Sequence, residues 1–438
     1  MVLRDLLNYI LTLECTFPNN AAHLINPFKM QTKLRFFFIF IIFCFFSFLF
    51  GLSLSKQSLI ERPILKKYQI QISNLSDILP IIYHLMRNYT GVAGLYVPLK
   101  KTINEEKFNV PGLYSYLTTD GWVILDKNDS SEIIIPIEWE KLKNLYYKHC
   151  ERKLCINSKF AAAPINPLKV GENIIFHLGF VLFKYNLKNK EFTAFKGQYH
   201  HSIEPFQDSL IYVCSYVDNT LYMKNDAISL ININTGKVVY KKSIPNILKK
   251  NLYGLLLGTN SITSINQDLI HVNDIQPVRQ NTNFAVVGDL LLSLRSLSTI
   301  ILYRPETDSI LWYSTGPWLN QHDVDILNDD MIGIYNNNVI RGVGFPGKTF
   351  SNISTYNFKT KIYGFIHHEV FRNLKIRSLN GSRFEILHNG NMFVEDSPGG
   401  MYYLISKEGN LISSKNFPYD KKNSVVGNWA RPYNTKNY

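Results

Sequence analysis

The chain lacks the short motifs that identify several large enzyme classes. It has no P-loop, no dinucleotide-binding glycine pattern and no Gly-x-Ser-x-Gly nucleophile elbow. Its histidines also lack HExxH or short-loop spacing, so a metal site could form only from residues that converge in space. These absences exclude the nucleotide, serine-hydrolase and zinc-protease sites that such motifs build.

Charged residues are scarce and form no long run of one sign. They make up 18% of the chain and apolar residues 46%, which predicts a sizeable core and excludes global disorder. The net charge of +13 suits nucleic acid, anionic lipid or a small anionic substrate, but it also follows from scattered lysines alone. Composition therefore leaves the partner open.

Cysteine is also scarce, with five in the chain. Cys150 and Cys155 are close in sequence. If this part of the chain is exported, its compartment permits a disulfide between them. Too few other Cys or His residues lie nearby for a local zinc site.

One long hydrophobic run is present, over residues 34–54, where Arg35 is the sole charged residue. About 20 apolar residues cross a bilayer as a helix. The preceding positive charges predict a cytoplasmic start, with the chain after Lys56 on the periplasmic or extracytoplasmic side of a single-pass protein. The run favours a retained signal-anchor over a cleaved signal. Residues 1–33 are then a cytoplasmic segment, or a misassigned extension if translation begins at Met30.

Five segments share one pattern, an apolar strand, a polar turn of about four residues and a second strand. They are "FKYNLKNKEFTAF", "SLININTGKVVYK", "ILYRPETDSILWY", "STYNFKTKIYGFI" and "YYLISKEGNLISS", with "GLYSYLTTDGWVILD" as a weaker sixth. The turn residues predict β-hairpins, and their repetition predicts an all-β, six-bladed β-propeller over residues 111–438. A large β-sandwich, or a pair of them, is the alternative. Residues 55–110 read as a mixed linker region with a helical patch, and residues 138–150 as a helix.

Polar residues lie between these hairpins, where a propeller brings its blades together. They form four groups: His200 and His201; His271, Asn273 and Asp274; Arg295 in an apolar strand; and Gln321, His322 and Asp323. Arginine suits forked contacts with tetrahedral oxyanions, and imidazole is a nucleophile or proton carrier. Each residue alone is more often structural, and the remaining histidines, among them His177, His367, His368 and His388, are interpreted that way. The set together predicts an anion-handling pocket.

The stretch "GDLLLSLRSLSTIILYRPETDSILWYSTGPWLNQHDVDIL" resembles the arylsulfotransferase family of bacterial, exported, PAPS-independent enzymes. "HVNDIQPV" and "HHSIEP" are similar to the family's earlier histidine elements, and "RFEILHNGNMFVEDS" and "NWARPY" to its last blade and closing segment. The resemblance covers roughly residues 170–435, and the order of the elements is more specific than any one of them.

This resemblance implies a six-bladed propeller that moves a sulfuryl group from an aryl sulfate donor to a phenolic acceptor. His322 would be the transiently sulfated nucleophile, with His271 and Arg295 as its catalytic partners. Asn273 and His201 would bind substrate, His200 being the less suitable neighbour. Asp323 would either orient the His322 ring or cap a loop. No metal, nucleotide cofactor or nucleic-acid partner is implied.

Two other hypotheses remain open from sequence. One is a non-catalytic, membrane-anchored propeller that binds a protein or glycan. The other is a propeller enzyme of different chemistry, such as a quinoprotein. A scaffold has no need for both Arg295 and His322, so the intact polar set favours the sulfotransferase hypothesis.

Overall fold

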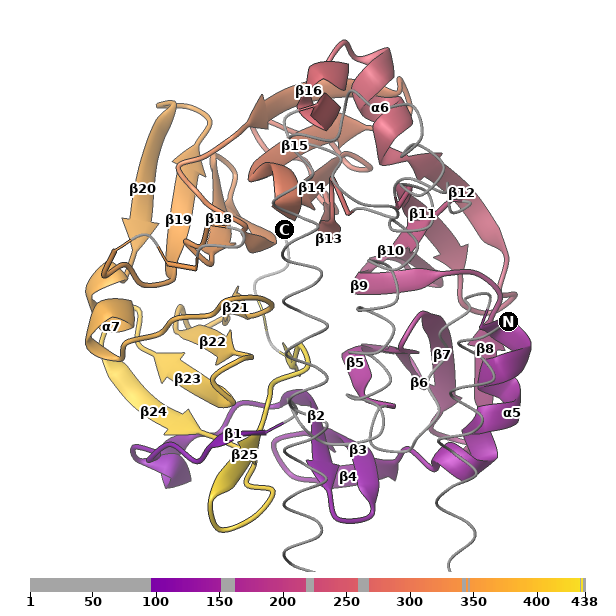
Figure 1. Cartoon of the computed structure of the whole chain (residues 1–438), viewed down its shortest axis with the longest axis vertical. Coiled ribbons are helices and arrows are strands. Elements are labelled where there is room, and N and C mark those ends of the chain that lie inside the picture. The colour runs from indigo at the N-terminus through magenta and orange to yellow at the C-terminus, as the bar shows by residue number, and fades with distance from the viewer. Residues whose placement is uncertain are drawn as a thin grey trace, which may run out of the picture. The chain divides into compact units, whose positions relative to one another are not determined.

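The computed structural model describes residues 96–150, 162–217, 224–258, 268–340, 344–345, 347–433 and 435. Within these residues the strands form six four-stranded antiparallel sheets around a central axis (Figure 1). The all-β, six-bladed propeller is therefore confirmed, and the sandwich alternative is wrong. No helix in the described part of the chain is long and apolar enough to cross a bilayer, and the hydrophobic run over 34–54 lies outside that part.

Each sheet runs from an inner strand at the axis to an outer edge strand. From the inside outward the first three sheets are β26 (Arg431–Pro432), β2 (Gly112–Thr118), β3 (Gly121–Lys127), β4 (Glu132–Pro136); β5 (Pro164–Val170), β6 (Asn173–Leu178), β7 (Val181–Asn186), β8 (Phe192–Phe195); and β9 (Tyr199–Gln207), β10 (Leu210–Tyr216), β11 (Asp226–Asn232), β12 (Val238–Ser243). The next three are β13 (Val272–Pro277), β14 (Leu290–Leu294), β15 (Thr299–Arg304), β16 (Ser309–Ser314); β17 (His322–Asn328), β18 (Met331–Asn336), β19 (Asn352–Asn357), β20 (Ile362–Ile366); and β21 (Arg383–Ile386), β22 (Met392–Asp396), β23 (Met401–Ile405), β24 (Leu411–Lys415).

A few elements lie outside the sheets. A short pair joins β1 (Tyr96–Pro98) to β25 (Asn423–Val425). The helices are α5 (Trp139–His149), α6 (Ile244–Lys250) and α7 (His368–Asn373), with 3₁₀ turns η2 (Glu105–Lys107), η3 (Gly254–Gly258) and η4 (Arg295–Leu297). Helix α5 confirms the helix predicted over 138–150, whereas the helical patch predicted before residue 90 lies outside the described residues.

The predicted hairpins are all present, and asparagine explains several of their turns. Five of them are the third and fourth strands of a sheet, and the sixth is β2–β3. At the end of the third strand, the side-chain oxygens of Asn186, Asn232 and Asn357 accept backbone N–H groups two or three residues further on. Such bonds mimic a backbone turn, so the sequence itself fixes where the chain reverses.

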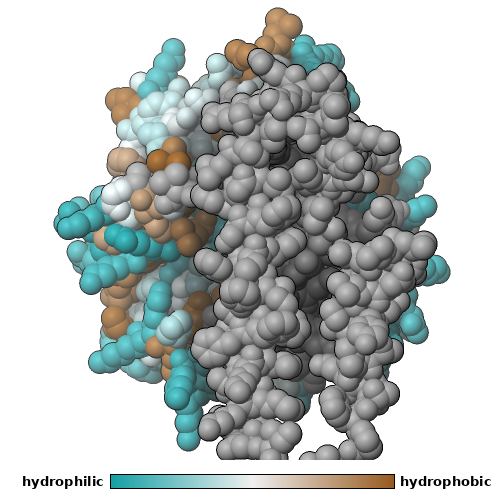
Figure 2. Space-filling model, viewed as in Figure 1, coloured by the Kyte–Doolittle hydropathy of each residue, from teal (hydrophilic) through white to brown (hydrophobic). Residues whose placement is uncertain are grey.

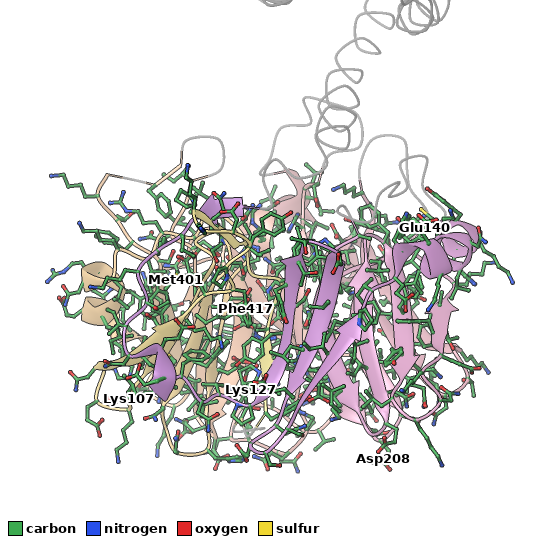
Figure 3. The ribbon with its side chains drawn as sticks, turned by 90° about the horizontal axis from the view of Figure 1, so that it is seen from below. Lys107, Lys127, Glu140, Asp208, Met401 and Phe417 are labelled. Carbon is green, nitrogen blue, oxygen red and sulfur yellow. The ribbon has the colours of Figure 1, made fainter. Side chains whose placement is uncertain are left out.

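Apolar side chains fill the spaces between adjacent sheets. Within the described residues, six buried clusters each join one sheet to the next. On the face seen in Figure 2, hydrophilic side chains gather mainly along the rim, with apolar ones between them. In the side view of Figure 3, Glu140 on α5 lies near one face, and Lys127 and Asp208 lie toward the other.

The C-terminal segment closes the ring. Strand β26 pairs with β2, with Gly112 opposite Pro432 and Leu113 opposite Arg431. A Cβ at Gly112 would lie 2.6 Å from the Arg431 carbonyl oxygen, so glycine is required for this approach. The first sheet is thus completed by the last strand, and the edge strands of an open sheet are avoided.

Candidate functional site

The predicted site residues converge at one end of the inner strands. His201, His271 and His322 come from three successive sheets, each within two residues of the start of its inner strand, β9, β13 or β17. The His201 and His271 ring centroids are 4.7 Å apart, and Trp429 stands 5.5 Å from His201 and 6.3 Å from His322. The indole therefore bridges the two sides of the cluster.

The backbone at this end is held in an unusual conformation. Every inner strand has a residue with positive φ at or near its start; these residues are Asn166, His201, His271, Asp323, Ser382 and Trp429. A non-glycine residue in the left-handed region costs about 1–3 kcal/mol and persists only where its surroundings impose it. His201, His271 and Trp429 belong to the candidate site, so three of the six strained positions coincide with it.

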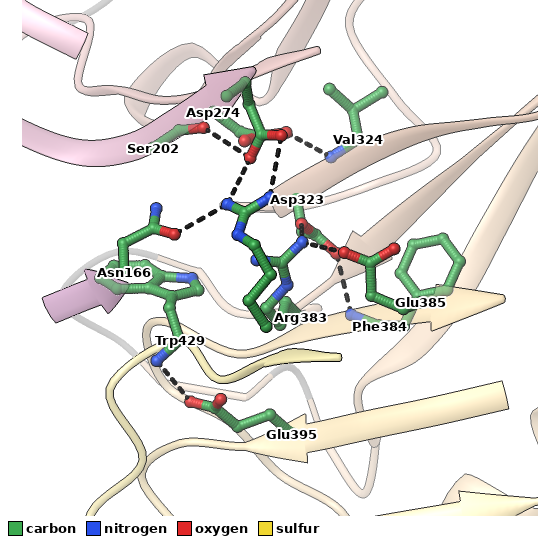
Figure 4. A network of polar contacts seen from close by, with 12 residues as sticks. Asn166, Ser202, Asp274, Asp323, Val324, Arg383, Phe384, Glu385, Glu395 and Trp429 are labelled. Atoms are coloured by element: carbon green, nitrogen blue, oxygen red, sulfur yellow. Dashed lines mark hydrogen bonds and ion pairs between the residues drawn. The ribbon is translucent and has the colours of Figure 1, made fainter. Parts of the chain in front are cut away.

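Carboxylates impose this conformation by joining one sheet to the next. Asp226 accepts the His271 N–H at 3.1 Å, and Asp274 accepts the Val324 N–H at 2.8 Å. Asp323 accepts the Phe384 N–H at 2.8 Å, in the network drawn in Figure 4. Each bond anchors the start of the following inner strand.

Asp323 therefore does not orient the His322 ring, as one sequence hypothesis had it. Its partners are the Phe384 N–H and the Arg383 guanidinium, 3.6 Å away, so it serves the alternative role of holding the backbone. Glu395 does the same for Trp429, accepting its backbone N–H at 2.9 Å (Figure 4).

Asn337 orients the His322 ring instead. Its amide nitrogen donates to the carbonyl oxygens of Ser378 and Gly381, at 2.9 and 3.1 Å, so its oxygen must face the imidazole. That oxygen lies 2.7 Å from His322 Nδ1, which therefore carries the proton. Nε2 is left with a lone pair, and the Gly381 N–H donates to it at 3.1 Å.

Burial disfavours positive charge on the three rings of the cluster. It lowers the pKa of His322 and of His201 well below the usual value, and lowers that of His271 less because Asp268 opposes the shift. Next to burial, the positive charge of Arg295 contributes most to the shift at His322. A buried, neutral imidazole with a fixed tautomer is a competent nucleophile near pH 7.

Arg295 differs from its predicted setting. Strand β14 ends at Leu294, and Arg295 begins the 3₁₀ turn η4, which closes at the left-handed residue Ser298. The Arg295 N–H donates to the His271 carbonyl oxygen at 3.0 Å, which holds the turn against the cluster. The prediction that Arg295 lies within a strand is wrong, but its charge lies near His271 and His322 as the site hypothesis needs.

Asn273 is 3% exposed and lies beside the residue that precedes His322. Its amide nitrogen donates to the Gln321 carbonyl oxygen at 2.9 Å. The same nitrogen carries a second N–H donor. All five predicted site residues therefore border one cluster.

Sequence reasoning missed Asn337, Gly381 and Asp268 and gave Trp429 no role. Asn337 lies in "NNN", where nothing distinguishes it, and Gly381 acts through its backbone. Asp268 precedes His271 by three residues, a spacing that could have been noticed, and accepts from its Nδ1 at 2.8 Å.

Two further features lie outside this cluster. A cavity of about 230 Å³ lies further along the inner strands, lined in part by Lys169, Glu204, Arg279 and Arg431, and it includes none of the predicted site residues. Within the described residues, no three His, Cys, Asp or Glu side chains gather to hold a metal ion.

Comparison with known proteins gives one family. Residues 182–417 match the family model described as arylsulfotransferase (ASST). No curated protein matches the chain.

Three solved structures are distantly similar to this chain. The WD40 β-propeller domain of Doa1 is 13% identical, with a TM-score of 0.40, over 77% of this chain and 96% of that one. TolB from Acinetobacter baumannii is 11% identical, with a TM-score of 0.41, over 74% of this chain and 67% of that one. Virginiamycin B lyase from Staphylococcus aureus is 8% identical, with a TM-score of 0.39, over 74% and 90%.

Proposed function

Because the chain belongs to the arylsulfotransferase (ASST) family, we propose that it moves a sulfuryl group from an aryl sulfate to a phenol through a sulfated His322. The observation that carries this proposal is the fixed tautomer of His322, whose Nε2 lone pair lies beside the Arg295 charge. No nucleotide sulfate donor is needed, since the aryl sulfate is itself the activated group.

In the first half-reaction, His322 Nε2 attacks sulfur. The N–S bond forms while the bond from sulfur to the aryl oxygen breaks, and the aryl oxygen leaves with the electron pair. Attack requires Nε2 to exchange the Gly381 hydrogen bond for sulfur, which frees that N–H as a donor beside the transferred group. In the second half-reaction the phenol oxygen attacks sulfur, the N–S bond breaks and the Nε2 lone pair is restored.

Charge and shape around His322 suit this transfer. Sulfuryl transfer, like phosphoryl transfer, spreads negative charge over the equatorial oxygens, so electrostatic stabilisation supplies most of the catalysis. Arg295 and the Asn273 amide are the donors we assign to those oxygens. The Trp429 ring, between His201 and His322, offers an apolar face to the aryl group. His201 or His271 gives the leaving oxygen its proton in the first half-reaction and takes the proton of the acceptor phenol in the second.

The test is release of 4-nitrophenolate from 4-nitrophenyl sulfate by the purified full-length chain in the presence of phenol. We expect release by the unaltered protein, none by His322→Ala, and unchanged release by His388→Ala, which removes an exposed histidine. Mass spectrometry of the protein quenched with donor alone should find one added SO₃ on the His322 peptide. Full activity of His322→Ala would exclude the assigned nucleophile. Inactivity of the unaltered protein would favour the non-catalytic alternative.

We also propose that the propeller acts outside the cytoplasm, held to the membrane by residues 34–54. This rests on the hydrophobic run and its flanking charges, and on Cys150, which is disulfide-bonded. Its predicted partner, Cys155, lies outside the described residues. Disulfides persist mainly in oxidising compartments. The test is protease added to cells whose outer layers have been removed and whose cytoplasmic membrane is intact. We expect digestion of the propeller, and protection of the propeller would contradict this location.

A further inference from the structure

A continuous line of hydrogen bonds runs through three imidazoles beside His322. We call this line the histidine chain; its members are the Ser215 carbonyl, His200, His201, His271 and the Asp268 carboxylate. Its four links are Ser215 O to His200 Nε2 (3.2 Å), His200 Nδ1 to His201 Nδ1 (2.8 Å), His201 Nε2 to His271 Nε2 (3.2 Å) and His271 Nδ1 to Asp268 Oδ2 (2.8 Å). Every ring nitrogen of the three histidines thus belongs to a link.

To make all of its hydrogen bonds, this chain needs one proton more than three neutral imidazole rings carry. A carbonyl and a carboxylate stand at the two ends, and both only accept. Four links therefore need four protons, whereas three neutral imidazoles carry three. With three protons one link has two lone pairs face to face; with four protons every link is made and the chain holds one positive charge. The chain can thus take up one proton or give one up, and can pass it from ring to ring.

The charges around the chain determine where that proton is stable. Although burial opposes it, the hydrogen bond and charge of His271, with Lys224 at 2.8 Å, hold the pKa of Asp268 well below its usual range, so Asp268 is the fixed counter-charge. Asp226 lies 3.6 Å from His200 Nε2, but burial and the Asp268 charge raise its pKa well above the usual range.

Three other groups face the chain and disfavour its extra proton. Arg295 and His322 lie on the site side, and His177 lies close to His200. Burial lowers the pKa of His200 as well as of the other two rings, so the extra proton is weakly held. A weakly held proton is readily given to a phenolate oxygen.

We propose that the histidine chain is a proton relay for sulfuryl transfer, with His200 and Asp268 as positioning residues that never touch the substrate. This rests on the proposed function. As the bond from sulfur to the aryl oxygen breaks, the chain gives one proton, from the Nε2 of His201 or His271, to the leaving oxygen. It takes one proton back when the acceptor phenol attacks. One turnover leaves the proton count of the chain unchanged.

A relay and a purely structural role predict different effects on different donors. Phenol is a much weaker acid than 4-nitrophenol, so phenyl sulfate needs a proton on its leaving oxygen far more than 4-nitrophenyl sulfate does. In Asp268→Asn and His200→Phe we expect kcat/KM for phenyl sulfate to fall at least about tenfold more than kcat/KM for 4-nitrophenyl sulfate, since general acid catalysis contributes about 10²–10⁴-fold. His388→Leu, a change at an exposed histidine outside the chain, should leave kcat/KM unchanged for both donors.

The possible outcomes separate the relay from the proposed function. Equal losses for the two donors, or no loss, in a folded variant would overturn the relay while the function stands. Inactivity of the unaltered protein toward both donors would overturn the proposed function. If both variants fail to fold, ¹⁵N NMR of the unaltered protein with labelled histidine decides the matter. The relay predicts that two or three ring signals shift together with uptake of a single proton, whereas independent or absent titrations of these rings would contradict it.

Discussion

At His322, two hydrogen bonds decide which ring nitrogen can react. The Asn337 amide is held by the carbonyl oxygens of Ser378 and Gly381, so it can only accept from Nδ1. The carboxylate of Asp323, although adjacent in sequence, points elsewhere. A neutral amide in this position fixes the tautomer and stabilises an imidazolium less than a carboxylate would, which suits a nucleophile that must keep its lone pair.

Replacing Asn337 should therefore impair the chemical step. In Asn337→Ala the ring loses the acceptor that fixes Nδ1–H, and we expect kcat for transfer to fall on the order of 100-fold or more, with KM little changed. Steady-state kinetics with 4-nitrophenyl sulfate measures both values. Asn338→Gly is the matched control, because it alters the next residue, whose amide bonds to the Phe350 carbonyl oxygen, and glycine suits the left-handed backbone there. A change in KM alone would show that Asn337 acts on binding and not on the nucleophile.

At the scale of the element, the hairpins could be predicted because their signals are local. Asparagine at a strand end bonds to the turn that follows, and apolar residues alternate on either side. The end of β14 could not be predicted, because the apolar pattern continues through Arg295. There the strand ends because the Arg295 N–H bonds to the carbonyl oxygen of His271, which lies in the loop before β13. Asn337 and Gly381 were unpredictable for the same reason, since they reach His322 only through the packing of two sheets.

The short strand β26 offers a test of how the ring is held closed. Arg431 forms a nearly buried pair with Glu204, at 2.7 Å, and bonds to Asn166 and to the Ile203 carbonyl. In Arg431→Met the Glu204 charge would stay buried without its partner, so we expect the free energy of unfolding to fall by about 3–5 kcal/mol, as measured by urea denaturation.

Two further variants test this explanation. Glu204→Gln combined with Arg431→Met should recover part of the loss, because no unpaired charge is then buried. Lys141→Met breaks an exposed pair with Glu138 and should cost less than about 1 kcal/mol. A loss for Arg431→Met as small as for Lys141→Met would mean that β26 closes the ring without this ion pair.

At the scale of the whole molecule, buried histidines and buried carboxylates affect acid stability in opposite directions. Burial raises the pKa of Asp323 well above its usual range. The free energy that burying its negative charge costs the folded state therefore disappears as the pH falls and the carboxylate takes up a proton. Burial lowers the pKa of the buried histidines. As the pH falls, the unfolded chain takes up their protons before the folded chain does, and the folded state loses stability. The pH dependence of the unaltered protein is a sum of both, and a single group must be separated by substitution.

His177 is the group best suited to that separation. It is 1% exposed, and neither ring nitrogen makes a hydrogen bond of normal geometry within the described residues. Burial lowers its pKa to about 3, and the His201 backbone opposes this only in part. The unfolded pKa is about 6.5, so the unfolded chain binds this proton first. The stability that a neutral His177 permits is therefore complete above about pH 6.5 and is lost as the pH falls from there toward 3.

His177→Leu should remove this sensitivity. Between pH 8 and pH 5 the unaltered protein should lose about 2 kcal/mol more stability than the variant, since each pH unit below 6.5 costs about 1.4 kcal/mol. Urea unfolding at both pH values measures the difference. His388→Leu, at an exposed histidine, should follow the unaltered protein at both. If His177→Leu loses stability in acid as steeply as the unaltered protein, the His177 ring must be able to take up a proton in the folded state, and the acid sensitivity must arise elsewhere in the molecule.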